Sequence, residues 1–377
     1  MAETRQGSLA PGRRLRPRGA GLFLLLPLVA RMPCAHLVTP AGYPGSQMVP
    51  APSAWLSLLT LKLLDKARRR PLSDGTCAEA LGLWAGRHRL PKTPCATDDS
   101  SRTPREPHPR LLAAWLPPLA PLLLPDASAC GLDFPPRPSR GDPTGLATHD
   151  IAPRGTAGTR SLPLCAHEPE SRVLCDAKAN LTRADQAGDL RHCIAFWPSR
   201  AGCEPQWLSC DAKVARSSDL SRGHQRGMGF VTMRRRGAAV RRRLHALPAH
   251  PWRRTVVEIP QRCHQHGRSR DETVKLRGYA GPLRPGALDG FGRAAFPLLV
   301  SHNLAGRARE RLIRSAGRHG VEDRLGIRVH GLPLDGVASE GRLHVDMEVA
   351  LTVLANGGYR WWATPLHGVD QAKPHQR

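Results

Sequence analysis

Two short apolar segments of the chain each carry an aspartate at a place where a β-strand would bury it. Asp133 lies between Leu132 and Phe134, and Asp211 directly follows the apolar run Trp207–Cys210. A carboxylate in an apolar strand is costly to bury unless cations or hydrogen-bond donors compensate its charge. The fold must therefore supply each acid with a partner. In a structural role the partner is an arginine or the backbone of a turn, and in a catalytic role it is a bound metal ion.

A third acid, Glu322, lies in the helical pattern of residues 305–326, with Arg318 one turn earlier on the same face. Carboxylates from separate elements are the ligands that hold the paired divalent ions of phosphodiester chemistry, and hard cations such as magnesium prefer oxygen ligands. The spacing of the three acids alone leaves both the catalytic and the structural interpretation open.

The order of the hydrophobic patterns predicts several folded parts. Residues 1–19 are a basic tail without order, and 20–126 form a helical N-terminal domain in which Pro52 begins a helix and Pro117 and Pro118 interrupt another. Short apolar runs of strand length, Trp207–Cys210 and Gly229–Met233 among them, then alternate with helical patterns over 127–233. A β-rich insertion covers 234–303, with strands at 255–259, 272–277 and 296–301. Helices return over 304–377, and the one at 344–360 has an apolar stripe of Met347, Ala350, Leu351 and Leu354. The chain is therefore predicted to be an α/β protein with a mixed sheet.

The chain is strongly basic: 56 Lys and Arg residues against 31 Asp and Glu residues give a net charge of +25. Such a charge favours polyanionic partners, nucleic acid above all, although charge alone does not separate DNA from RNA or a membrane surface. We predict phosphate contacts from a dense arginine segment and, more weakly, from a lysine close to the second aspartate; the alternative is a solvated run of charge. These residues are Arg234, Arg235, Arg236, Arg241, Arg242, Arg243 and Lys213.

The ten cysteines contain no C-x-x-C pair, so a structural zinc site has little support, and Cys263, His264 and His266 are too crowded to serve one ion well.

The apolar run 21–30 follows several arginines and resembles a secretory signal, which would make the chain a secreted, disulfide-bonded protein. The run is too short to span a membrane. We favour instead the first buried helix of a cytoplasmic protein.

Long segments of the chain resemble bacterial insertion-sequence transposases, whose catalytic DDE domain is RNase H-like. The segments include AGYPGSQMVPA, SLLTLKLLDK, RLLAAWLPPLAPLL, GLDFPPRPSRGDPTGL, ESRVLCDAKANLTRADQAGDL, EPQWLSCDAKV, GFVTMRRRGAAVRRRL, RHGVEDRLGI and VDMEVALTVLANGGYRWWA. The resemblance implies an RNase H-like mixed-sheet core interrupted by the β-rich insertion.

The resemblance also implies a site and a reaction. Asp133, Asp211 and Glu322 would be the catalytic residues and the ligands of two Mg²⁺ or Mn²⁺ ions, and Arg318 would contact phosphate near the cut. The enzyme would cleave double-stranded DNA at terminal inverted repeats and join the freed three-prime ends to target DNA. It would act as a homodimer, in the bacterial cytoplasm at the nucleoid and away from membranes.

Several positions depart from the family pattern. The family's Tyr-x-x-Arg-x-x-x-Glu signature has Ser315 in place of its tyrosine, Asp176 replaces another tyrosine, and Pro135 stands where the family has histidine. Such changes are typical of a degenerate copy, and equally of drift in an active GC-rich lineage. A catalytically inactive DNA-binding remnant and a product that does not fold therefore remain as alternatives.

Overall fold

The computed structural model describes a set of segments separated by gaps. They are Phe23, Met32 and residues 34–47, 49–63, 103–104, 106–133, 137–138, 148–150, 157–161, 164–179, 186–210, 216–233, 238, 242, 246, 253–257, 265–271, 278–281, 283, 286–289, 298–300 and 342–371. The predicted tail 1–19, nearly all of the apolar run 21–30 and the predicted helix 305–326 lie outside the described residues.

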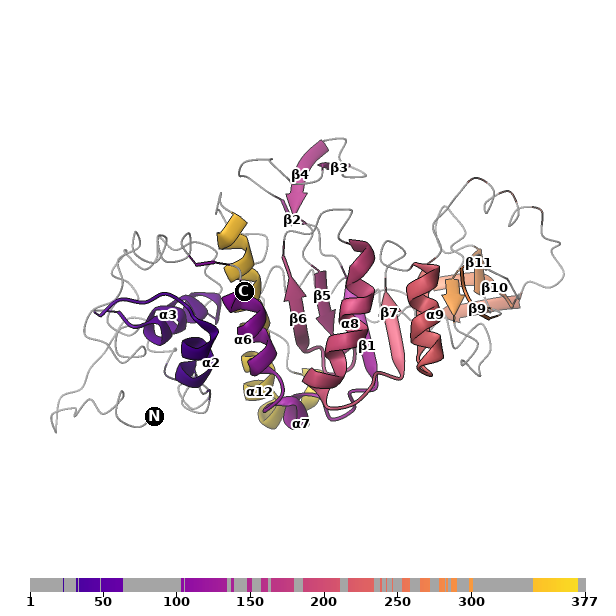
Figure 1. Cartoon of the computed structure of the whole chain (residues 1–377). Coiled ribbons are helices and arrows are strands. Elements are labelled where there is room, and N and C mark those ends of the chain that lie inside the picture. The colour runs from indigo at the N-terminus through magenta and orange to yellow at the C-terminus, as the bar shows by residue number, and fades with distance from the viewer. Residues whose placement is uncertain are drawn as a thin grey trace.

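The first described helices are α2 (Cys34–Ala41) and α3 (Ala51–Leu63). Helix α3 begins at the residue before Pro52, as predicted, because proline's missing N–H is not needed in the first turn of a helix. Its apolar face buries Trp55, Leu58 and Leu59. Helix α2 packs against α3, which makes a compact helical unit at one end of the molecule (Figure 1).

Helices α6 (Pro107–Trp115) and α7 (Ala120–Leu123) follow. The break between them contains Pro117 and Pro118, where an interruption was predicted, because proline cannot donate the backbone hydrogen bond that continues a helix. Trp115 ends α6 with its side chain fully buried.

Five strands form one end of the main sheet, in the order β6-β5-β1-β7-β8, with β6 at the edge. Neighbours among β6, β5 and β1 are antiparallel, whereas β1, β7 and β8 are parallel. The prediction of a mixed sheet in an α/β fold is confirmed, and β7 and β8 have the predicted bounds. The strands are β1 (Ala129–Asp133), β5 (Leu164–His167), β6 (Leu174–Lys178), β7 (Trp207–Cys210) and β8 (Gly229–Met233).

Helices α8 (Gln186–Ala201) and α9 (Ser217–Gln225) connect these strands and lie in front of the sheet in Figure 1. Helix α9 crosses from β7 to the parallel strand β8, as a parallel pair requires. Helix α8 is held to the start of β1, because the indole nitrogen of Trp197 donates a hydrogen bond to the carbonyl oxygen of Ala127 at 3.3 Å.

The long helix α12 (Arg342–Gln371) packs against β6 and also against α3, α6 and α7. Its apolar stripe of Met347, Ala350, Leu351 and Leu354 is buried, as the sequence pattern predicted. Gly357 lets α6 approach closely, because a side-chain methyl there would lie 3.0 Å from the indole nitrogen of Trp115. Helix α12 therefore joins the N-terminal helices to the sheet.

Four more strands extend the sheet beyond β8 in the order β12-β11-β10-β9, each antiparallel to its neighbour. They are β9 (Arg253–Val257), β10 (Gln265–Asp271), β11 (Gly286–Asp289) and β12 (Leu298–Val300). Strands predicted at 255–259 and 296–301 overlap β9 and β12, and the one predicted at 272–277 lies outside the described residues. A small separate sheet contains β2 (Arg137–Pro138), β4 (Ala157–Ser161) and β3 (Thr148–Asp150).

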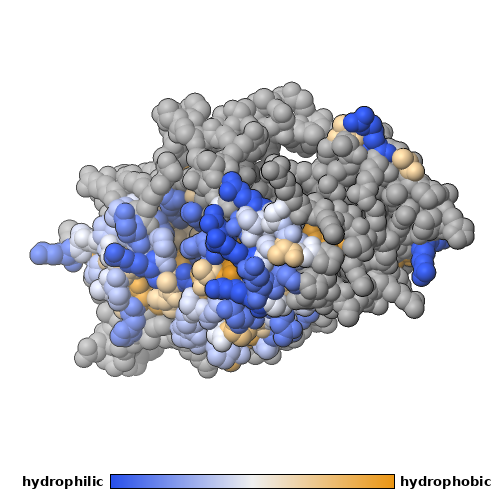
Figure 2. Space-filling view, turned by 45° about the vertical axis from the view of Figure 1, so that its right-hand side comes forward, coloured by the Kyte–Doolittle hydropathy of each residue, from blue (hydrophilic) through white to orange (hydrophobic). Residues whose placement is uncertain are grey.

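One hydrophobic core runs through the described residues, from the N-terminal helices to the central strands. The face in Figure 2 is mostly hydrophilic where residues are described, with apolar colour in small patches. Leu122 is the large apolar side chain that these residues leave exposed. Within the described segments, no helix has both the length and the apolar composition required to cross a bilayer.

A buried ion pair fixes α12 to α3. The ammonium nitrogen of Lys62 lies 2.5 Å from a carboxylate oxygen of Glu348, and the two side chains are 3% and 9% exposed. Glu348 begins a row of buried polar residues at four-residue spacing along α12, which continues through Thr352, Asn356 and Arg360. Asn356 accepts a hydrogen bond from the backbone N–H of Leu174 at 2.8 Å. The polar row thus reaches from α3 to the edge of strand β6.

We predict that Lys62→Met destabilises the protein by about 3–5 kcal/mol, because it leaves the carboxylate of Glu348 buried without its cation. The double variant Lys62→Met/Glu348→Leu should recover most of that loss, since an apolar pair of similar volume replaces both charges. Urea unfolding followed by circular dichroism measures both changes. A double variant as unstable as the single one would contradict this account of the pair.

A second buried polar cluster lies among the N-terminal helices. The hydroxyl oxygen of Tyr43 lies 2.8 Å from Nδ1 of His108, and the ring of Trp55 packs edge-on against Tyr43. Burial lowers the pKa of His108 from 6.5 to about 4, and it raises the pKa of Tyr43. The folded protein therefore keeps the imidazole neutral over a pH range in which the unfolded chain protonates it.

We predict that the free energy of unfolding decreases as the pH falls from about 6.5 towards 4. In this window His108 binds a proton in the unfolded state but not in the folded state. The free energy of unfolding therefore falls by roughly 1.4 kcal/mol for each pH unit. Chemical denaturation at a series of pH values measures the slope. His108→Gln should flatten it, whereas His36→Gln on the exposed side of α2 should not; equal slopes in all three proteins would contradict the assignment.

Candidate functional site

Asp133 is the last residue of β1, and its side chain is 8% exposed. Strand β1 lies between β5 and β7, with Asp133 opposite Cys165 in β5 and Leu132 beside Cys210 in β7. The strand reaches this position because the apolar residues Cys130 and Leu132 are buried in the core. The predicted first metal ligand therefore lies at the carboxyl end of a central strand, next to the carboxyl end of its parallel neighbour.

The pleat of β1 separates its residues onto two faces of the sheet. Cys130 contacts Cys193 of α8, so Cys130 and Leu132 face that helix. Successive side chains in a strand point to opposite faces, which places Gly131 and Asp133 on the face away from α8. The candidate site lies on this second face.

A row of three residues crosses the sheet just below Asp133 on that face. Gly131 pairs with His167 in β5 and with Ser209 in β7. His167 is 3% exposed, and a side-chain methyl at Gly131 would come within 2.3 Å of its imidazole ring. The histidine ring can lie over β1 only because Gly131 has no side chain. The ring therefore covers β1 directly beside Asp133, at the base of the candidate site.

Ser209 completes this row on the side of β7. Its hydroxyl oxygen is buried and has no hydrogen-bond partner among the residues that the structure describes. A buried hydroxyl without a partner costs free energy, so this position favours occupation by a polar group. The site therefore combines a carboxylate, an imidazole and a hydroxyl on neighbouring strands.

These row residues were missed by sequence reasoning, which singled out Asp133 alone in this region. Strand β5 was not predicted, so His167 had no assigned neighbour. One signal was present: a glycine inside a strand pattern often marks the close approach of another group. Gly131 is such a glycine.

Most of the other predicted site residues lie outside the described residues. This holds for Asp211, Glu322, Arg318 and Lys213, and for the basic residues Arg234, Arg235, Arg236, Arg241 and Arg243. Arg242 is described and exposed, as a phosphate contact requires. The predicted convergence of three acids thus stays a prediction. Among the described residues, no three His, Cys, Asp or Glu side chains are grouped to hold a metal ion.

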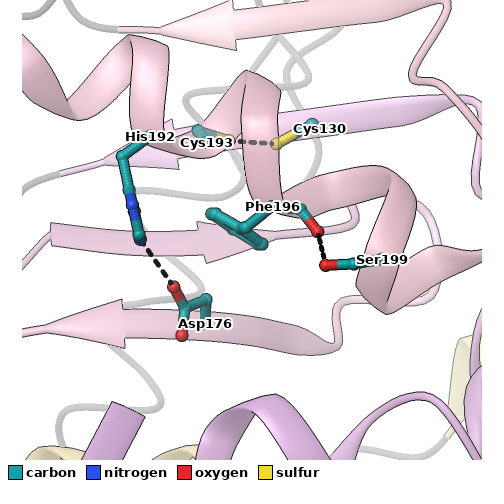
Figure 3. Close-up of polar contacts among 6 residues, drawn as sticks. All are labelled: Cys130, Asp176, His192, Cys193, Phe196 and Ser199. Carbon is teal, nitrogen blue, oxygen red and sulfur yellow. Dashed lines mark hydrogen bonds and ion pairs between the residues drawn. The ribbon is translucent and has the colours of Figure 1, made fainter.

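The opposite face of the sheet carries a different polar contact, between β6 and α8 (Figure 3). Nε2 of His192 lies 3.7 Å from a carboxylate oxygen of Asp176, and the ring of Phe196 packs beside the imidazole. The guanidinium carbon of Arg200 lies over the ring of Phe196, at 5.5 Å from the ring centre. Burial lowers the pKa of Arg200, and the charge of Asp176 opposes that shift. The carboxylate of Asp176 therefore offsets part of the effect of burial on the guanidinium of Arg200.

Comparisons with known proteins give limited information on relatives. No family model matches the chain, and no curated protein matches it. Among solved structures, the fold is similar to a piggyBac transposase in a synaptic complex with hairpin DNA, determined by cryo-electron microscopy. The TM-score is 0.48 at 8% sequence identity, and the alignment covers 97% of this chain and 78% of that one.

We predict that Gly131→Ala destabilises the protein by roughly 1–3 kcal/mol, because the new methyl group overlaps the ring of His167. Gly188→Ala in α8 is the matched control: nothing lies within 4 Å of its new methyl group, and alanine stabilises a helix relative to glycine. Thermal unfolding compares the two. The account of this row is wrong if Gly131→Ala is as stable as the unchanged protein.

Proposed function

We propose that the chain is a DDE-type DNA transposase, which cleaves double-stranded DNA at the ends of its own insertion sequence and joins them to target DNA. The active site in this proposal lies at the carboxyl ends of β1 and β7. The support comes from the position of Asp133, from the basic charge of the chain and from the family resemblance of its segments.

The observation that carries the proposal is the register of the parallel pair β1 and β7. Leu132 lies beside Cys210, so Asp133 and Asp211 are the next residues along two adjacent chains that run in the same direction. Asp211 directly follows the last residue of β7 in the chain, and consecutive Cα atoms across a trans peptide are only about 3.8 Å apart. In the proposal, the two aspartates that the resemblance assigns to metal binding therefore lie together at this edge of the sheet.

The chemistry of these residues fits a divalent cation. Carboxylates are the oxygen ligands that Mg²⁺ and Mn²⁺ prefer, and a largely buried carboxylate such as Asp133 is stabilised by a nearby positive charge. Asp133, Asp211 and Glu322 would hold two such ions, which when bound would activate the attacking oxygen and stabilise the leaving oxygen.

Other residues of the chain would position the DNA. Arg318, one helical turn before Glu322, would contact the phosphate at the cut, and the arginines of 234–243 with Lys213 would contact phosphates farther along the duplex. His167 and Gly131 would keep the floor of the site rigid below Asp133.

The architecture in this proposal is an RNase H-like core, made from the five strands β6, β5, β1, β7 and β8 with α8 and α9. A mixed set of five strands with an aspartate at the end of the middle one supports it. The protein would act as a homodimer, because two element ends must be paired before they are joined, and it would work at the nucleoid in the bacterial cytoplasm.

We predict that Asp133→Asn abolishes Mn²⁺-dependent cleavage of a labelled duplex made from the DNA that flanks the coding sequence. Loss of a metal ligand removes several kcal/mol of transition-state stabilisation, which corresponds to a decrease of about a thousandfold or more. Asp126→Asn is the matched control, because Asp126 is exposed and its oxygen accepts a hydrogen bond from the N–H of Ser128 that asparagine can keep.

Thermal unfolding in the presence of Mn²⁺ gives a second readout that does not depend on catalysis. The unchanged protein and Asp126→Asn should both gain stability with added ion, and Asp133→Asn should gain less. A folded protein that binds the duplex but neither cleaves it nor responds to Mn²⁺ would be a DNA-binding remnant instead. Cleavage by Asp133→Asn at the original rate would rule out the proposed site.

A further inference from the structure

Four cysteines meet in the core where α8 packs on the sheet. Cys130 in β1, Cys175 in β6, Cys193 in α8 and Cys210 in β7 are each fully buried. The cysteines that the structure describes form no disulfide bond with one another. Neither the proposed function nor the departures from the family pattern involve this group of thiols.

Two of the four sulfur atoms lie very close together. Sγ of Cys130 and Sγ of Cys193 are 3.1 Å apart, although the residues are 63 positions apart in the sequence (Figure 3). A disulfide bond is about 2.05 Å long, so the sulfur atoms need to approach by only about 1 Å. The helix and the strand are already held at this separation by the hydrogen bond from Trp197 to Ala127.

The surroundings of the pair determine how fast it would react. Burial raises the pKa of Cys130, and the neighbouring thiols of Cys193, Cys175 and Cys210 raise it further. Burial raises the pKa of Cys175 as well. Since the thiolate is the reactive form, these thiols react slowly at neutral pH, whereas Cys203 is exposed and available to reagents in solution.

We propose that Cys130 and Cys193 are a modification site, at which a hydroperoxide such as hydrogen peroxide forms an intramolecular disulfide between β1 and α8. The peroxide oxidises one thiol to a sulfenic acid and releases water. The sulfur of the other cysteine then attacks the sulfenic sulfur, the S–S bond forms, and a second water leaves. In total, two thiols and one hydrogen peroxide give one disulfide and two waters.

The bond would connect two parts of the core that the fold otherwise holds by packing and by the hydrogen bond from Trp197 to Ala127. It would join α8 to β1 three residues before Asp133. Because it closes a loop of more than 60 residues, it removes much of the conformational freedom of the unfolded chain. The oxidised protein should therefore unfold at a higher temperature than the reduced protein.

Peptide mapping of the full-length protein tests the proposal. The reduced protein is treated with hydrogen peroxide without denaturant, its remaining thiols are alkylated, and it is digested with trypsin under non-reducing conditions. The expected product is residues 111–140 linked to residues 192–200, each of which contains a single cysteine. The link should form more slowly than Cys203 is oxidised, and its rate should rise about tenfold per pH unit, in proportion to the thiolate.

Variants assign the effect to the pair. Cys193→Ser should lose both the linked peptide and the rise in unfolding temperature on oxidation, and Cys210→Ser should keep both. If a variant does not fold, the presence or absence of the linked peptide in the unchanged protein still tests the proposal. The proposal is overturned if Cys203 becomes oxidised while no 111–140 to 192–200 link forms, or if Cys130 links preferentially to Cys175 or Cys210.

Discussion

The parallel pairing of β1 with β7 is the interaction on which the arrangement of the site depends. It aligns Leu132 with Cys210, and it leaves one aspartate at the end of β1 and another directly after the end of β7 in the chain. The pairing is determined by the apolar residues of both strands, which are buried in the hydrophobic core. If β1 were shifted by one residue relative to β7, the side chain of Asp133 would point to the opposite face of the sheet. The core residues that fix the strand register therefore also fix the position of this carboxylate.

Helix α12 gives this sheet a rigid neighbour. It packs against β6 on one side and against the N-terminal helices on the other, and its buried polar row contacts both. The ion pair of Lys62 with Glu348 and the hydrogen bond of Asn356 with Leu174 specify how the helix is rotated, because an apolar surface alone would allow it to shift. Segments more than 280 residues apart in the sequence thereby form a single core.

Much of the secondary structure could be predicted from local patterns. The runs Trp207–Cys210 and Gly229–Met233 are strands with the predicted bounds, and the stripe that begins at Met347 lies on a buried helix face. Strand β5 was missed because its four residues are all buried, so it shows no alternation of polar and apolar side chains. Strand order and the extension of the sheet from β8 to β9 depend on contacts between distant residues, which local periodicity does not contain.

For the site, the sequence indicated Asp133 from its apolar surroundings, but not His167 or Ser209, which become its neighbours only when β5 and β7 pair with β1. The most direct test of the account is a crystal structure of the protein with Mn²⁺, located by its anomalous scattering. The account predicts a manganese peak that the carboxylates of Asp133 and Asp211 share at the ends of β1 and β7. Carboxylates of Asp133 and Asp211 that point away from each other, with no ion between them, would contradict it.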